Sequence, residues 1–275
     1  MAKEIEELLQ GVVSGLGLPL TQAQCNQLAT HFSLLLRWNQ KINLTAVRRP
    51  QQIATRHFEE SLFLLKLVSC APGLLIDVGS GAGFPGLAVK IACPSLSAVL
   101  LEPNHKKATF LKEVIRSCGL ENVEVRTQRL EDAIRAATVS ERTPNRESLP
   151  RASPRGEGAG TEPPPPNSEP LAFLSGYDFS RAAPTAKRTA ALAAEVAGRA
   201  TLVTLRAVHS PRKMLAALAQ LLAPQGQLAL FLGSDDARAT AALHSFHWSS
   251  PAPIPHSHRR VILLGCLATE SEPRQ

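Results

Sequence analysis

Residues 74–86, with the sequence LLIDVGSGAGFPG, are the most informative stretch of this chain for its fold class. Their first part, 74–78, is a short apolar run closed by glycine, which is typical of a buried strand in a parallel sheet. The glycines that follow permit positive φ angles and let backbone N–H groups approach a ligand closely. The stretch therefore predicts a strand that turns, through a binding loop, into a helix at 87–93.

Strands and helices alternate on the carboxyl side of this loop. Further strands are predicted at 98–101, 123–126, 202–205, 227–232 and 261–267, with helices at 106–118 and 211–222. Three helices precede the first strand, at about 4–18, from the cap Thr21 to about 38, and at about 51–67. This order predicts an α/β protein with a mostly parallel sheet, helices on both of its faces and an N-terminal helical segment.

The predicted elements divide the chain into a helical segment, 1–70, packed on a core domain, 71–275, that carries the sheet. A proline-rich stretch interrupts this domain at about 140–199, and within it residues 141–170 hold eight of the 21 prolines but only three clearly apolar residues. A segment of this composition buries too little apolar surface to offset its ordering entropy. We therefore expect a disordered or extended insertion at the surface.

Composition narrows the class of partner and the compartment. Lysine and arginine outnumber aspartate and glutamate by 30 to 23, and the resulting net charge of +7 favours a polyanionic partner. Five cysteines, an odd number without a C-x-x-C pair, make a disulfide scaffold or a cysteine-built zinc site unexpected and indicate a reducing interior. The chain shows no signal-peptide pattern and no run of about 18 apolar residues, so we expect a cytoplasmic protein, by default a monomer.

The glycine loop is open to two functional interpretations, beside that of a turn that binds nothing. Residues 81–86 match G-x-G-x-x-G, and Glu102 lies near the spacing of a ribose-binding acid, which is compatible with a dinucleotide site. The pattern Asp77-x-Gly79-x-Gly81 better suits S-adenosylmethionine (SAM), because Asp77 can balance the ammonium and sulfonium charges of that ligand. In either case, the carboxylate of Glu102 can accept hydrogen bonds from both ribose hydroxyls.

Two further motifs carry a family resemblance. RWNQKINLTAVR at 37–48, followed by RHFEES at 56–61, resembles the RsmG or GidB family of bacterial small-subunit (16S) rRNA guanine-N7 methyltransferases. The resemblance extends over about 20–132 and 200–265, including the glycine loop and the segment that begins at Arg206. It implies a Rossmann-like methyltransferase fold, SAM as cofactor, and N7 of a guanine in 16S rRNA as the methyl acceptor, in the free rRNA or in a ribosomal assembly particle.

The resemblance also implies roles for individual residues. The cofactor-binding candidates are Asp77, Gly79, Gly81, Phe84, Glu102, Leu130, Glu131 and Arg206. Arg206 is expected to position cofactor and substrate, although a strand-end arginine paired with Asp77 or Glu131 is the plain structural alternative. No general base is expected, because guanine N7 already presents a lone pair. No metal site is expected either. The candidates for RNA contact are Arg37, Lys41, Arg48, Arg56, Lys106 and Lys107, with Arg49 beside them.

Two departures from the family pattern keep other functions open. Thr201 stands where an aspartate is expected at the start of a strand, and Leu232 stands where a lysine is expected before Gly233. We expect both positions to touch the catalytic face, which leaves a catalytically weakened rRNA-binding protein as one alternative. An NAD(P)-binding oxidoreductase is the other, supported by the G-x-G-x-x-G match, but no hydride-transfer site is recognisable.

Overall fold

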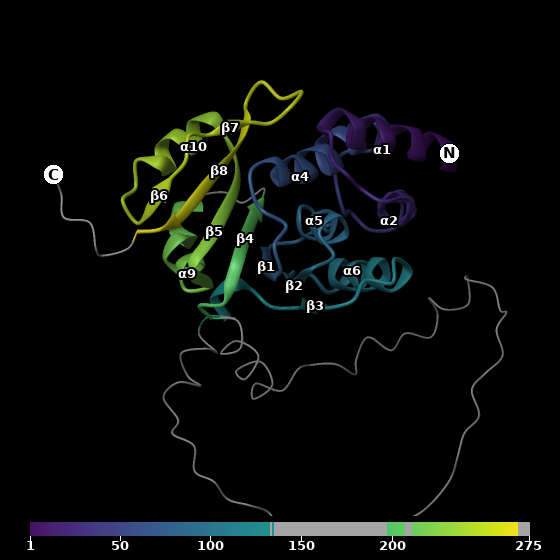
Figure 1. The fold of residues 1–275 in the computed structure, drawn as a ribbon. Coiled ribbons are helices and arrows are strands. Elements are labelled where there is room, and N and C mark those ends of the chain that lie inside the picture. The colour runs from purple at the N-terminus through teal and green to yellow at the C-terminus, as the bar shows by residue number, and fades with distance from the viewer. Residues whose placement is uncertain (133, 135–196, 207–210, 269–275) are drawn as a thin grey trace, which may run out of the picture.

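A computed structural model describes residues 1–132, 134, 197–206 and 211–268. These residues form one eight-stranded sheet in the order β3-β2-β1-β4-β5-β8-β6, with β7 paired to β8 (Figure 1). Its strands are β1 (Gly73–Val78), β2 (Leu96–Leu101), β3 (Val123–Arg126), β4 (Ala200–Arg206), β5 (Leu222–Gly233), β6 (Phe246–Trp248), β7 (Ala252–Pro253) and β8 (Arg260–Leu267). The insertion expected at about 140–199 lies outside the described residues, apart from 197–199.

The topology of the sheet creates a binding crevice next to the glycine loop. From β1 the chain moves outward through β2 to β3, then returns to β4 on the other side of β1, and these strands and β5 run parallel. Ligands of open α/β sheets bind at the carboxyl ends of the strands where the strand order reverses in this way. Here that point lies between β1 and β4, where Asp77 is in register with Thr204.

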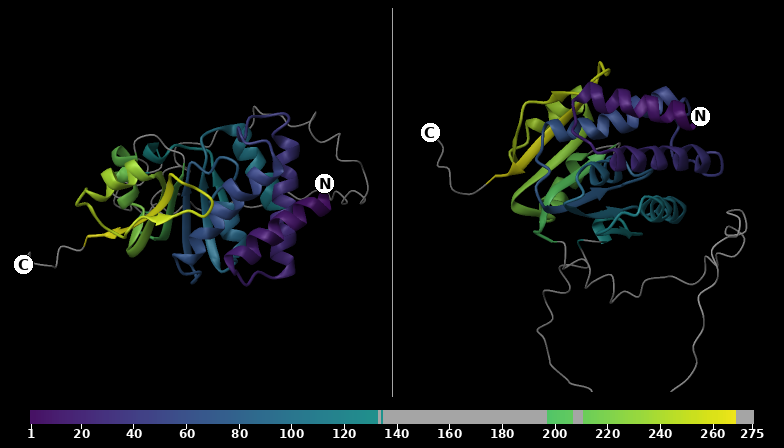
Figure 2. Two further views of the ribbon diagram at one scale, coloured as in Figure 1. Left: turned by 90° about the horizontal axis from the view of Figure 1, so that it is seen from above. Right: turned by 45° about the vertical axis from the view of Figure 1, so that its right-hand side comes forward.

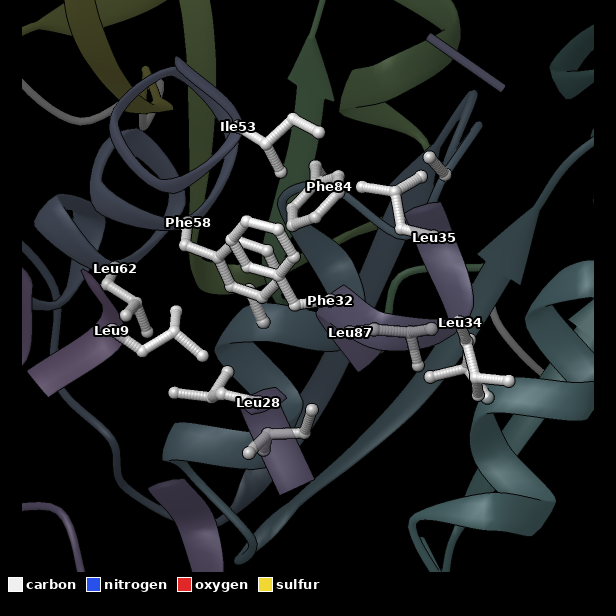
Figure 3. Packing of buried hydrophobic residues seen from close by; sticks show 14 of the residues in the cluster. Leu9, Leu28, Phe32, Leu34, Leu35, Ile53, Phe58, Leu62, Phe84 and Leu87 are labelled. Carbon is white, nitrogen blue, oxygen red and sulfur yellow. The ribbon is translucent and has the colours of Figure 1, made fainter. Parts of the chain in front are cut away.

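Helices cover both faces of the sheet, as Figures 1 and 2 show. One face carries α1 (Ala2–Leu16), α2 (Gln22–Trp38), α5 (Gly86–Ala92) and α6 (His105–Ser117), and the other carries α9 (Leu215–Ala219) and α10 (Ser234–Ala241). The first face holds the larger apolar cluster, in which Phe32, Phe58 and Phe84 pack between the helical segment and the glycine loop (Figure 3). The predicted α/β class is therefore confirmed.

Local signals fix the ends of the first two helices. Gly17 adopts a left-handed conformation, φ 60°, and ends α1 as the sequence predicts. Thr21 accepts a hydrogen bond from the backbone N–H of Gln24, whose side chain accepts one from the backbone N–H of Thr21. This reciprocal capping box starts α2.

The third predicted helix, at about 51–67, forms but is not a regular α-helix. It consists of α3 (Pro50–Ile53), a π-helical segment η1 (Ala54–Glu59), α4 (Glu60–Phe63) and a 3₁₀ turn η2 (Leu64–Lys66). A π-helical segment shifts the angular position of the residues that follow it. As a result, the five consecutive residues 58–62 are all buried, among them Glu59 and Glu60, which apolar spacing does not place in a core.

The predicted helix at 211–222 is too long. A 3₁₀ turn, η4 (Pro211–Met214), leads into α9, and β5 already begins at Leu222, which pairs with Ala200. The register of this pair then shifts, so that Gln227 pairs with Leu202, and a Cβ atom at Gly226 would overlap the Ala200 carbonyl oxygen. This bulge lengthens β5 backward into the expected helix. Sequence patterns also do not reveal α10, β6 and β7.

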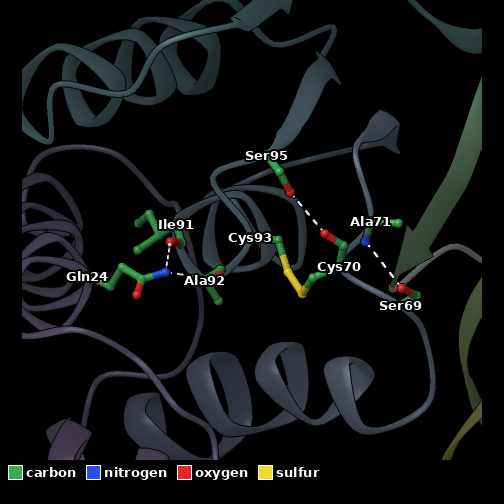
Figure 4. The surroundings of a disulfide bond; sticks show 8 residues. All are labelled: Gln24, Ser69, Cys70, Ala71, Ile91, Ala92, Cys93 and Ser95. Carbon is green, nitrogen blue, oxygen red and sulfur yellow. Dashed lines mark hydrogen bonds between the residues drawn. A yellow bond between two sulfur atoms is a disulfide. The ribbon is translucent and has the colours of Figure 1, made fainter.

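A disulfide joins Cys70, just before β1, to Cys93 at the end of α5 (Figure 4). Its Cα atoms lie 5.4 Å apart, and the Ser95 hydroxyl donates to the Cys70 carbonyl oxygen at 2.9 Å. The odd cysteine count makes a disulfide scaffold unexpected and indicates a reducing interior, and the structure nevertheless contains this one bridge. Among the described residues, no helix is long and apolar enough to cross a membrane.

Candidate cofactor and substrate site

The glycine loop leaves β1 and crosses to the end of β2. The backbone N–H groups of Gly79 and Ser80 donate to the Leu101 carbonyl oxygen, at 2.8 and 3.1 Å. Gly79 and Gly81 have φ angles of 73° and 55°, which other residues rarely adopt. A Cβ atom at Gly79 would meet nothing within 4 Å, and one at Gly81 would meet only a backbone oxygen, at 3.8 Å. The outer surface of this loop is therefore open space.

Asp77 anchors the loop from below. Its side chain is 1% exposed, and its two oxygens accept hydrogen bonds from the Thr204 hydroxyl at 2.6 Å and from the Gly86 backbone N–H at 3.1 Å. Burial raises the pKa of Asp77, and the Thr204 hydrogen bond opposes that rise. A Cβ atom at Gly86 would lie 2.5 Å from the carboxylate, so only glycine fits there. Asp77 thus ties β1, β4 and the start of α5 together at the crevice.

Glu102 closes the opposite side of the loop. It follows β2 and is buried, and its carboxylate accepts hydrogen bonds from the backbone N–H groups of Gly81 and Asn104, both at 2.8 Å. Each carboxylate oxygen can accept two hydrogen bonds, so each keeps one position for a further donor. Asn104 also caps α6 by accepting from two backbone N–H groups, although no sequence pattern singled this residue out.

The remaining cofactor candidates occupy different environments. The ring of Phe84 is buried between His31 and His57, with ring centroids at 4.8 and 5.0 Å, so the side chain belongs to the core beneath the loop. Leu130 is buried in the apolar cluster on the other face of the sheet, and Glu131 beside it is exposed.

Arg206 ends β4 and is held by the π-helical segment. One guanidinium nitrogen lies 2.9 Å from a carboxylate oxygen of Glu60 and also donates to the Arg56 carbonyl oxygen, while the guanidinium carbon lies 5.8 Å from the centre of the Phe231 ring. The suggested pairing with Asp77 or Glu131 is therefore wrong, because Glu60 supplies the carboxylate. Burial lowers the pKa of Arg206, and Glu60 opposes that change.

The RWNQKINLTAVR motif forms a loop that one asparagine holds in shape. The side chain of buried Asn39 accepts from the backbone N–H groups of Leu44 and Thr45 and donates to the Thr45 carbonyl oxygen, each at 3.0 Å. The Thr45 hydroxyl in turn lies 2.8 Å from the Nε2 atom of His57. This loop, residues 39–48, is thereby attached to the π-helical segment that also contacts Arg206, and it is called the fixed loop below.

The candidates for RNA contact lie on the surface, with one partial exception. Arg37, Lys41, Arg48 and Arg56 are exposed, as is Lys106, whereas Lys107 is half-buried in the first turn of α6. The ring of Trp38 contacts that of Phe110, 5.8 Å between centroids, and so links the start of the motif to α6.

Two histidines lie beneath the loop, of which His31 is buried and His57 is half-buried. The Nε2 atom of His31 lies 2.8 Å from the Ala82 carbonyl oxygen, and burial lowers the pKa of His31 to about 4. Burial, together with Arg206, lowers the pKa of His57 to about 3. Both rings are therefore neutral near pH 7, and each packs against Phe84.

Thr201 does not lie at the crevice, contrary to expectation, whereas Leu232 lies near the carboxyl end of β5, at the edge that carries the crevice. Thr201 is near the start of β4, five residues before Arg206, and its hydroxyl donates to the Leu74 carbonyl oxygen at 3.2 Å. Five residues of strand span about 16 Å, which places Thr201 at the opposite edge of the sheet. The Leu232 side chain is buried in the apolar cluster of the second face.

Comparisons with known proteins agree with this architecture. Residues 24–143 match the family described as GidB, rRNA small subunit methyltransferase G. A ribosomal RNA small subunit methyltransferase G of Xylella fastidiosa is 45% identical over 120 residues, 42% of this chain and 56% of the relative. The protein of the same name from Chromobacterium violaceum is 43% identical over 131 residues, 48% of this chain and 62% of the relative. The chain thus matches little more than half the length of these relatives.

Among solved structures, a methyltransferase from Geobacter sulfurreducens superimposes with a TM-score of 0.50 over 94% of this chain and 93% of that one, at 13% identity. This likeness supports the Rossmann-like methyltransferase fold. The stretch matched by the family contains most of α2, the fixed loop, the π-helical segment, the glycine loop and Glu102. Over residues 24–143, this chain is similar to the GidB family, rRNA small subunit methyltransferase G.

Proposed function

We propose that this protein is a SAM-dependent methyltransferase that methylates N7 of a guanine in 16S rRNA. One observation carries the proposal: a glycine loop with an open outer surface lies at the switch point of the sheet, beside the carboxylate of Glu102. This loop belongs to the part of the chain that matches the rRNA methyltransferase family. The division at residue 70 into a helical segment and a core domain remains part of the proposal.

The residues around the loop fit an adenosyl ligand. The open side of Gly79 and Gly81 admits close approach of the ligand to the backbone, and Glu102 keeps two acceptor positions for ribose hydroxyls. Leu130 and Glu131 follow β3 and are assigned to the adenine side. Phe84 supports the loop from the core beneath it, and Asp77 holds the loop in shape and adds negative charge near the ligand. When bound, SAM supplies an electrophilic methyl group.

For methyl transfer to N7, the protein has to orient the reacting atoms and place charged groups beside them. Guanine N7 carries a lone pair, so no residue has to remove a proton before the methyl group is transferred. Holding the reacting atoms in line is worth several kcal/mol of the barrier. Arg206, which Glu60 and the Arg56 carbonyl hold at the end of β4, is assigned to positioning the guanine or an adjoining phosphate. No catalytic base is assigned.

Small-subunit rRNA, free or in an assembly particle, is the proposed partner, and the cytoplasm the proposed site of action. Exposed basic residues of α2, the fixed loop, the π-helical segment and α6 would contact its phosphates: these are Arg37, Lys41, Arg48, Arg56 and Lys106, with Lys107 beside them. Monomeric action is the simplest form of the proposal.

Incubation of the purified full chain with isotope-labelled SAM and unmodified 16S rRNA tests this function. Mass spectrometry of the nucleosides should find labelled 7-methylguanosine. SAM binding without transfer to the free rRNA or to small-subunit particles would instead favour an rRNA-binding protein that has lost turnover. Binding of NADH but not of SAM would favour the oxidoreductase alternative.

A further inference from the structure

We propose that Glu60 is a positioning residue that holds two arginines, Arg206 and Arg260, side by side at the edge of the sheet where the crevice lies. Arg260 then becomes an additional contact for the RNA. The inference rests on the proposed methyl transfer to rRNA. It assigns a role to Glu60, which lies in the RHFEES motif but has no role assigned so far, and to Arg260, which lies outside both motifs.

Each oxygen of the Glu60 carboxylate forms an ion pair with an arginine of a different strand. One oxygen lies 2.9 Å from a guanidinium nitrogen of Arg206, at the end of β4, and the other lies 2.5 Å from one of Arg260, at the start of β8. The Glu60 side chain is only 3% exposed. Charge-assisted hydrogen bonds of this kind are strong and directional, so Glu60 fixes the separation of the two guanidinium groups.

The sheet places both arginines at the same edge. Arg206 is in register with Phe231 of β5, and Gly233 of β5 is in register with Arg260. Because β8 runs antiparallel to β5, its first residue lies at the edge where the parallel strands end. This is the edge that carries the crevice.

The two arginines differ in access to solvent. The side chain of Arg206 is 13% exposed, whereas that of Arg260 is 38% exposed and is also held by the Ser257 hydroxyl, at 3.2 Å from its Nε atom. Two guanidinium groups and one carboxylate leave one net positive charge, which suits a phosphate or the O6 atom of a guanine. Arg206 is therefore the inner group of the pair and Arg260 the outer one.

The charges that face Glu60 explain why a carboxylate persists in a buried place. Burial raises the pKa of Glu60, while Arg206, Arg260 and Arg56 each lower it. The neighbouring carboxylate of Glu59 is directed instead to His256, whose Nε2 atom lies 3.4 Å away. The π-helical segment turns both glutamates inward, and Glu60 is the one between the arginines.

The test compares five variants of the full chain: the single variants Glu60→Gln, Glu60→Asp and Arg260→Gln, the double variant Glu60→Gln/Arg260→Gln, and the control Glu113→Gln. The control removes a carboxylate from an ion pair with Arg116 on the surface of α6, at 2.9 Å. Steady-state methyl transfer to 16S rRNA gives kcat and KM, calorimetry gives the affinity for SAM, and thermal unfolding identifies variants that do not fold.

For Glu60→Gln we expect kcat to fall at least tenfold, with SAM affinity within twofold of the wild type, and we expect Glu60→Asp to restore part of kcat. Arg260→Gln should raise KM for rRNA several-fold with little change in kcat. In the double variant Glu60→Gln/Arg260→Gln, kcat/KM should fall by less than the product of the falls in the two single variants, because both residues act through one contact. The control should match the wild type.

Each other outcome rejects a defined claim. A folded Glu60→Gln protein with wild-type kcat and KM would overturn the positioning role, as would a Glu60→Asp protein no better than Glu60→Gln. If Glu60→Gln does not fold, the Arg260→Gln variant tests the inference in its place. A KM for rRNA equal to that of the wild type in Arg260→Gln would then overturn it. If the wild type transfers no methyl group at all, the proposed function fails instead.

Discussion

Replacement of Gly86 by alanine tests how Asp77 shapes the crevice. The added Cβ atom would lie 2.5 Å from one carboxylate oxygen of Asp77, 2.7 Å from its Cβ and 2.8 Å from its Cγ. Asp77 is fully enclosed, so it has no room to retreat without breaking its hydrogen bonds to the Thr204 hydroxyl and the Gly86 backbone. Gly86→Ala should therefore distort the loop as well as destabilise the fold.

The structure sets the size of this effect. Overpacking of a well-packed site costs about 1–3 kcal/mol, and a lost hydrogen bond to a charged group costs about 1.5–3 kcal/mol. The gain in helix propensity at the first residue of a helix is small, so we expect a net loss of about 3 kcal/mol in unfolding free energy. For a domain of this size, that loss lowers Tm by about 6–12 °C.

Thermal unfolding and titration with SAM measure both parts of the effect. Gly11→Ala is the matched control, since Gly11 lies in α1 and an added Cβ atom there would meet no other atom within 4 Å. The control should gain about 0.5–1 kcal/mol, because alanine is the better helix former. A Gly86→Ala protein with the Tm and SAM affinity of the wild type would refute the role given to Asp77.

Three further predictions concern pH, salt and the fixed loop. Because burial lowers the pKa of His31 from 6.5 to about 4, the unfolded chain binds more protons in this window, and stability present above pH 6.5 is lost as pH falls toward 4. The unfolding free energy, measured with urea, should fall between pH 7 and pH 5 by about 2 kcal/mol less in His31→Gln than in the wild type. An equal fall in both proteins would contradict the lowered pKa of His31. Lys41→Ala and Arg48→Ala should each lower the slope of log affinity for rRNA against log salt by about 0.7–0.9, whereas Lys3→Ala on α1 should leave it unchanged; equal slopes in all three would argue against the basic surface. Asn39→Ala removes three hydrogen bonds of the fixed loop, so hydrogen exchange of the loop's amides should speed up at least tenfold. Unchanged protection would show that the loop keeps its structure without the Asn39 side chain.

Apolar periodicity and short caps are sufficient to predict most elements of the fold. The strand at 123–126 has the predicted bounds, Gly17 ends α1, and Thr21 starts α2, because each depends on a local signal. The bulge near Gly226 depends instead on a carbonyl group of a neighbouring strand, which no window of sequence contains. The prediction of a helix at 211–222 therefore extends too far.

The site is less accessible to sequence reasoning than the fold. The glycine loop and Glu102 follow from their spacing, but the ion pairs of Glu60 depend on a π-helical segment that turns two acidic residues inward. The bridge between Cys70 and Cys93 depends on the packing of α5, since pairing cannot be deduced from the positions of cysteines in a sequence. The expectation that Thr201 touches the catalytic face is wrong because Thr201 is near the start of β4, whereas the crevice lies at the carboxyl ends of the parallel strands.

Calorimetric titration of SAM into the wild type and into Gly79→Arg examines the proposed cofactor site itself. Gly119→Arg is the matched control: Gly119 also has a positive φ, 58°, and open space around it, but it follows α6 and lies away from the crevice. We predict saturable binding to the wild type and to the control, and none to Gly79→Arg. Equal binding to all three proteins, or no heat with the wild type, would contradict the assignment of the glycine loop to SAM.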